Sequence, residues 1–241
     1  MSADDSAAPD WRVCADAATL ATHGAACVAA LAERAIRQRG EFRIALAGGN
    51  TPQALYRELR SLATDWTAWH IYFGDERCVP VNDPDRNNRM AQKAWLEHVP
   101  IPQAQVHSIP AEVGPAAGAR IYADELQRAG RLDLAVLGVG EDGHTASLFP
   151  GRDLGDSATA SLALPVFDAP KPPAERVTLS LAALNASRWI IVLADAEGKR
   201  GAIAQWQAGE DLPVSRLAPA EALIVFLTAS ATPNGSANMS R

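Results

Sequence analysis

The sequence has no long hydrophobic run: no uninterrupted apolar stretch among its 241 residues reaches the roughly eighteen residues that a membrane span needs. It also lacks the features of a signal peptide, because the first six residues include two aspartates where a signal peptide is basic, and no apolar segment follows them. We therefore expect a cytoplasmic protein that does not interact with a membrane.

Cysteines are few, and basic residues are outnumbered by acidic ones. The three cysteines (Cys14, Cys27 and Cys78) have no metal-binding spacing and are odd in number, so we expect reduced thiols and no metal site. The net charge of −6 argues against nucleic acid as the main partner. An anionic small ligand stays compatible with this charge, because binding depends on the local field.

Short apolar runs alternate with helical patterns along the chain. We predict strands over 42–47, 69–73, 132–139, 189–194 and 223–228, and helices over 16–38, 52–62, 87–96, 116–129 and 197–207. This alternation predicts an α/β fold in which a mainly parallel sheet is covered by helices on both faces. No linker divides the chain, so we expect one domain over residues 1–241, with flexible ends at 1–10 and 231–241.

One segment, 150–175, contains five prolines and little periodicity. A loop of this length in a compact domain is often a lid or a binding loop. A plain surface connection explains its length equally well.

The most informative run is 132–151, where a predicted buried strand ends in a glycine-rich turn with Glu141, Asp142 and His144. Loops at the carboxyl ends of parallel strands often carry catalytic groups. A neutral imidazole can take a proton from water, and the nearby carboxylate of Asp142 can orient it, so the pair is a candidate general base. A metal site is a weaker alternative, because no second histidine follows at ligand spacing.

The same run matches the dinucleotide-binding spacing G-x-G-x-x-G over 138–143. That fingerprint requires a helix at the third glycine, yet Pro150 and Gly151 follow closely, and two acidic side chains would face the pyrophosphate. We therefore disfavour a dinucleotide cofactor.

Two further turns follow predicted strands. Gly48 and Gly49 precede Asn50, Thr51 and a helix; Thr51 suits the N-cap, and such a helix start favours a phosphate, although a simple tight turn is the plainer alternative.

The other turn carries Asp75, Glu76 and Arg77, which indicate either a salt-bridge cluster or an arginine that pairs with a phosphate or polarises a carbonyl. Arg176 and Lys199 also follow turns and are further candidates for binding an anion, although each taken singly is more simply explained as a solvated surface charge.

Several stretches together resemble the 6-phosphogluconolactonase family. They occur in the family's order between about residues 42 and 225, and the segment around His144 is the most specific. The matching stretches are 47–52, 73–77, 82–88, 138–150 and 176–178.

The resemblance implies the Rossmann-like parallel sheet that is shared with glucosamine-6-phosphate deaminase and ribose-5-phosphate isomerase. It also implies hydrolysis of 6-phospho-D-glucono-1,5-lactone to 6-phospho-D-gluconate in the oxidative pentose phosphate pathway, by a monomer without metal or organic cofactor. By the same resemblance, His144 activates water, and the positions that hold the phosphate or the lactone oxygens are the Gly48–Thr51 loop, Arg77, Arg176 and Lys199.

Two alternatives differ from this function. The deaminase branch has a glutamate five residues beyond its histidine, where this chain has Phe149, so ring opening would lose a proton donor. Asp75, a proton-transfer base in that branch, is then expected to position Arg77 or the sugar. A sugar-phosphate sensor without catalysis would have a broken acid–base site, yet Asp142, His144 and Arg77 are all present.

Overall fold

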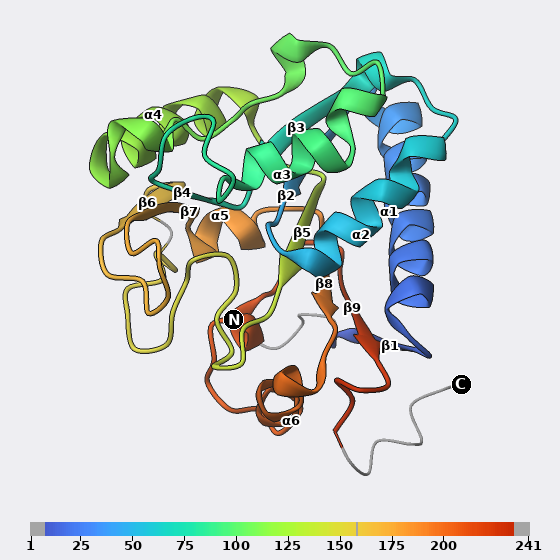
Figure 1. Ribbon diagram of the computed structural model, residues 1–241, viewed down its shortest axis with the longest axis vertical. Coiled ribbons are helices and arrows are strands. Elements are labelled where there is room, and N and C mark those ends of the chain that lie inside the picture. The colour runs from blue at the N-terminus through green and yellow to red at the C-terminus, as the bar shows by residue number, and fades with distance from the viewer. Residues whose placement is uncertain (1–7, 158, 234–241) are drawn as a thin grey trace, which may run out of the picture.

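A six-stranded parallel sheet forms the centre of the computed structural model, which describes residues 8–157 and 159–233 (Figure 1). The strand order is β1-β9-β8-β5-β2-β3, and every pairing in it is parallel. The strands are β1 (Asp10–Cys14), β2 (Phe42–Leu46), β3 (Trp69–Phe73), β5 (Leu134–Gly138), β8 (Trp189–Ala194) and β9 (Ala222–Thr228).

Both faces of this sheet are covered. All six residues of β8 are buried, although successive side chains of a strand point to opposite faces. Such a strand has to be apolar throughout, which explains why the sequence shows it as a continuous hydrophobic run. The five predicted strands are confirmed, with bounds that differ by at most two residues.

Six α-helices accompany the strands in the described part of the chain: α1 (Ala17–Arg39), α2 (Asn50–Glu58), α3 (Asn87–Ala94), α4 (Pro115–Ala129), α5 (Leu181–Asn185) and α6 (Arg200–Gln207). The side chain of Asp16 caps the start of α1 by accepting a hydrogen bond from the Thr19 N–H at 2.8 Å. Gly40 ends this helix in the left-handed conformation, at φ 81°. The five predicted helices are confirmed, and α5 is an addition that the sequence did not indicate.

A second sheet was missed by the prediction. It is antiparallel, has the order β4-β7-β6, and consists of β4 (Asp75–Arg77), β7 (Arg176–Leu179) and β6 (Ala163–Val166). It lies beside the main sheet and packs against α4 (Figure 1). The prediction that 150–175 has no regular structure was therefore wrong, because β6 lies within it. Strands this short have no readable period, and their pairing depends on distant partners.

The prediction for the chain ends is corrected in part. Asp10, expected to be flexible, begins the edge strand β1, which pairs with β9. Ala231 is fully buried. The remainder of that prediction, for 1–7 and 234–241, lies outside the described residues. Within the described part of the chain, no helix is long and apolar enough to cross a membrane.

Candidate active site

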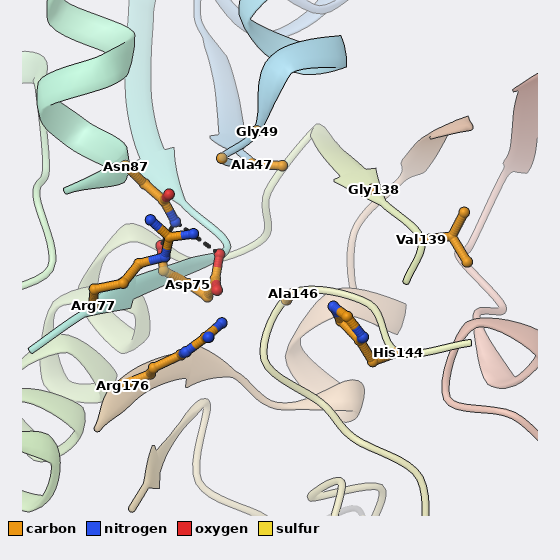
Figure 2. A pocket seen from close by; sticks show the side chains of 11 residues that line it. Ala47, Gly49, Asp75, Arg77, Asn87, Gly138, Val139, His144, Ala146 and Arg176 are labelled. Carbon is orange, nitrogen blue, oxygen red and sulfur yellow. Dashed lines mark hydrogen bonds between the residues drawn. The ribbon is translucent and has the colours of Figure 1, made fainter. Parts of the chain in front are cut away.

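Two adjoining cavities lie at the carboxyl ends of β2 and β5, and four residues line both: Gly49, Arg77, His144 and Arg176. The Asp75 cavity, of about 170 Å³, is further lined by Ala47, Gly48, Asp75, Asn87, Gly138, Val139 and Ala146. The Lys199 cavity, of about 560 Å³, is further lined by Glu141, Asp142, Phe149, Pro170, Lys171, Pro172 and Lys199. Figure 2 shows the Asp75 cavity with His144 on one side and Arg77, Arg176 and Asp75 on the other.

The His144 imidazole is oriented by Asp142. Its Nδ1 lies 2.5 Å from Oδ1 of Asp142, so Nδ1 carries the proton and its N–H donates a hydrogen bond to the carboxylate. The ring also packs on Phe149, with 4.9 Å between ring centroids. Nε2 has no hydrogen-bond partner within 8–157 and 159–233, and its lone pair is available to a ligand. Partial burial would raise the pKa of Asp142, but the hydrogen bond and charge of His144 lower that pKa below its ordinary value.

A tight turn, and no helix, follows β5. The N–H of Gly143 donates to the Gly140 carbonyl at 3.1 Å, and the N–H of Gly140 donates to the His144 carbonyl at 2.7 Å. Gly143 has a φ of 79°, which favours glycine. Because no helix starts at Gly143, this segment lacks the geometry of a dinucleotide-binding fingerprint.

Within the Gly48–Thr51 loop, α2 starts at Asn50, two residues earlier than predicted. Gly49 is the N-cap, at φ 100°, so the prediction of Thr51 as the N-cap was wrong. Asn50 and Thr51 are the first residues of the helix, and their side chains line neither cavity. Their backbone N–H groups belong to the first turn, where no helical acceptor is available, so this end of α2 attracts an anion. Gly48 has no space for a side chain, because a Cβ would lie 1.9 Å from Oδ1 of Asn87.

Arg77 and Arg176 are directly opposite each other in the second sheet, on the antiparallel pair β4 and β7. Two like charges in that position repel, and an anion between them would remove the repulsion. Backbone carbonyls hold both guanidinium groups: Arg77 donates to Asp85, and Arg176 donates to Pro173 at 2.9 Å and to Lys171 at 2.6 Å. Burial lowers the pKa of Arg176, the charge of Asp75 raises it, and Arg77 lowers it.

Asp75 is held by neighbours from two other segments. Its side chain accepts hydrogen bonds from Nδ2 of Asn87 at 3.0 Å and from Oγ of Ser147 at 2.6 Å. The residue is 6% exposed. Sequence reasoning missed Asn87 and Ser147 as site residues, although both lie in stretches that carried the resemblance.

Lys199 and Lys171 bring two more cations to the Lys199 cavity. Burial lowers the pKa of Lys199; the carboxylate of Glu141 raises that pKa, and Lys171 lowers it. Lys171 was missed because its proline-rich segment has no pattern that indicates a site.

The family model for glucosamine-6-phosphate isomerases/6-phosphogluconolactonase matches residues 15–226. The chain belongs to this family.

Individual relatives are similar over most of the chain. A 6-phosphogluconolactonase from Synechocystis is 38% identical over 78% of this chain and 80% of its own length. One from Mycobacterium tuberculosis is 38% identical over 75% of this chain and 78% of its own length. These matches confirm the predicted family and the predicted enzyme class.

Solved structures of the family share the fold. A 6-phosphogluconolactonase from Thermotoga maritima matches with a TM-score of 0.85 at 25% identity, over 92% of this chain and 100% of the other. One from Trypanosoma brucei matches with a TM-score of 0.82 at 28% identity, over 93% and 97%. A monomeric glucosamine-6-phosphate deaminase matches with a TM-score of 0.81 at 19% identity, which extends the shared fold to that branch, as predicted.

Proposed function

We propose that this protein hydrolyses 6-phospho-D-glucono-1,5-lactone to 6-phospho-D-gluconate, the lactone hydrolysis of the pentose phosphate pathway, with His144 as the general base. One observation carries the proposal: the oriented His144–Asp142 pair and the opposed cations Arg77 and Arg176 all line the Lys199 cavity. Lactone hydrolysis needs a base for water, charge stabilisation at the carbonyl and a grip on the distant phosphate. The names of the relatives support the same reaction.

The proton path begins at the free nitrogen of His144. As a water oxygen bonds to the lactone carbon C1, its proton moves to Nε2, and the carboxylate of Asp142 stabilises the resulting imidazolium through Nδ1. The tetrahedral intermediate then collapses, the bond between C1 and the ring oxygen breaks, and Nε2 returns the proton to that oxygen. Atoms and charge balance without any other reactant.

Arg77 is our candidate for stabilising the oxyanion. It lines both cavities and faces His144 across the Asp75 cavity (Figure 2). A positive charge fixed in this position favours the transition state, because the carbonyl oxygen gains negative charge as water adds. The carboxylate of Asp75, which is hydrogen-bonded to Asn87 and Ser147, helps to hold the side of the cavity on which Arg77 lies.

The phosphate is held where the Gly48–Thr51 loop, Arg176 and Lys199 meet. Gly49, Arg176 and Lys199 all line the Lys199 cavity, and Lys171 adds a cation that the sequence did not indicate. Backbone N–H groups at the start of α2 complete an environment suited to a dianion. Binding energy at this remote group orients C1 toward Nε2.

The test is the rate of acid release from freshly prepared lactone, corrected for spontaneous hydrolysis. We expect His144→Asn to lower kcat by about 10²- to 10⁴-fold, the usual contribution of a general base. His98→Asn, which changes an exposed histidine outside both cavities, is the matched control. A wild-type chain no faster than buffer would favour the sensor, and an unimpaired His144→Asn variant would remove His144 from its role.

The deaminase branch is tested separately with glucosamine 6-phosphate. Phe149, 4% exposed, packs on the His144 ring, so no carboxylate is available there to assist ring opening. We expect no ammonia release above the buffer rate.

A further inference from the structure

Glu76 is a buried carboxylate without a part in the proposed chemistry. It lies between Asp75 and Arg77 on β4, and successive side chains of a strand point to opposite faces. Asp75 and Arg77 line the Asp75 cavity, whereas Glu76 does not, and its exposed fraction is 0%. A buried carboxylate is costly unless its oxygens are bonded, so its contacts show what it does.

Those contacts join β4 to the start of α3. Oε1 of Glu76 accepts from the backbone N–H of Arg77 at 2.8 Å and of Asn87 at 2.7 Å, and Oε2 accepts from the N–H of Asn88 at 2.9 Å. Asn87 and Asn88 are the first two residues of α3, whose N-cap, Arg86, provides no side-chain acceptor. Glu76, which lies on β4, therefore caps the N-terminus of α3. The helix dipole also favours a negative charge at this end of the helix.

A buried cation completes the arrangement. Arg86 is 2% exposed, and its Nε lies 3.4 Å from Oε2 of Glu76. Arg86 also donates to the carbonyl of Ile109 at 3.0 Å. The Glu76 carboxylate is thus hydrogen-bonded to backbone N–H groups and also forms an ion pair with Arg86. These contacts fix the position of β4 relative to the start of α3.

We infer that Glu76 is a positioning residue for the active site. It holds the backbone of Arg77 directly, and it holds Asn87, whose Nδ2 fixes the carboxylate of Asp75. The arginine that faces His144 and the carboxylate beside it are thereby placed by a residue that touches no substrate. The kinetic consequence of this inference rests on the proposed lactonase function.

The test is a double-mutant cycle between Glu76→Gln and Arg77→Ala. The glutamine keeps one acceptor oxygen, and its N–H₂ group faces either the N–H of Asn88 or the N–H groups of Arg77 and Asn87, so in either orientation the contact between β4 and the start of α3 shifts. Since a displacement of about 1 Å can cost about 10²-fold in rate, we expect kcat/KM to fall about 10- to 100-fold in the wild-type background. In the Arg77→Ala background we expect the same change to cost less than about threefold, because Asp75 acts by helping to hold Arg77, so both routes from Glu76 end at a side chain that is gone.

Equal losses in both backgrounds would overturn the inference, because a purely structural role lowers activity independently of Arg77. Glu112→Gln is the matched control: it also removes a carboxylate that pairs with Arg86, at 3.3 Å, but on the exposed side. We expect it to change kcat/KM less than about twofold. If circular dichroism shows that Glu76→Gln is unfolded, the cycle is repeated with Glu76→Asp, which keeps the charge and withdraws the carboxylate by one methylene, and the same two outcomes decide.

The cycle is also measured on the dissociation constant for 6-phosphogluconate by calorimetry. A wild-type chain without lactonase activity would refute the proposed function, and the binding cycle would still decide the role of Glu76. A wild-type chain with activity but an additive cycle would refute the positioning role alone.

Discussion

Gly140 and His144 are so close that no side chain fits on the glycine. A Cβ on Gly140 would lie 2.0 Å from Nδ1 of the imidazole and 2.5 Å from Oδ1 of Asp142. The backbone brings the two residues together, because the Gly140 N–H donates to the His144 carbonyl at 2.7 Å. The imidazole of the proposed base therefore packs on the backbone of its own turn.

Gly140→Ala should displace the His144 ring. The φ of Gly140 is not in the left-handed region, so alanine fits the backbone and the added methyl acts through its contact with the ring. We expect kcat to fall by about 10²-fold, because the base no longer lines up with water. Gly201→Ala, where a Cβ meets nothing within 4 Å, is the control. A Gly140→Ala variant with wild-type kcat would show that the ring position does not matter.

Asp142→Asn should remove the group that keeps the proton on Nδ1 of His144. An amide N–H₂ near Nδ1 favours the tautomer whose proton is on Nε2, and that tautomer cannot accept a proton from water. We expect kcat to fall at least about 10²-fold with little change in KM, measured by acid release. Glu141→Gln changes the adjacent exposed carboxylate and is expected to retain kcat at pH 7. Equal kcat values for the two variants would contradict the orienting role.

Binding of 6-phosphogluconate should weaken in alkaline solution. Burial lowers the pKa of Lys199 from the ordinary lysine value of about 10.4. Its ammonium attracts the phosphate at neutral pH, and as the pH rises the ammonium loses its proton before the pH reaches that ordinary value. We expect the dissociation constant, measured by calorimetry between pH 7 and 10, to rise with pH. Lys199→Arg should flatten the curve, and Glu141→Gln should move its midpoint to lower pH, because the Glu141 carboxylate raises this pKa.

Lys171→Arg is the matched control for this titration, because it replaces the other lysine of the cavity and leaves Lys199 in place. A pH dependence that disappears in Lys171→Arg and persists in Lys199→Arg would assign the titration to Lys171 and contradict the prediction.

Ala196→Gly should stabilise the fold. Ala196 precedes the turn that carries Lys199 and has φ 93° and ψ 146°, a conformation that glycine adopts much more easily. Relief of strain of about 1–3 kcal/mol outweighs the added flexibility of the unfolded chain, about 0.4–1 kcal/mol. We expect a higher melting temperature by calorimetry. Ala204→Gly, at an exposed position within α6, should instead lower it, by about 1 kcal/mol of stability.

The central sheet and the His144 turn could be predicted because their signals are local. The strand Trp189–Ala194 is apolar at every position since both of its faces are covered, and its predicted bounds match the structure. The glycines around Asp142 and His144 indicated a tight turn directly after a buried strand. By contrast, β4, β6 and β7 are only three or four residues long, so they have no period that a sequence pattern can reveal.

The sequence by itself determined which chemical groups end the central strands, because strand burial and turn chemistry act between neighbours along the chain. The tertiary structure alone decided which of these groups meet. The register of β4 and β7 sets Arg77 opposite Arg176, and a loop returns Ser147 to Asp75, 72 residues earlier. Such contacts depend on how distant segments pack in three dimensions, and local propensity carries no information about that packing.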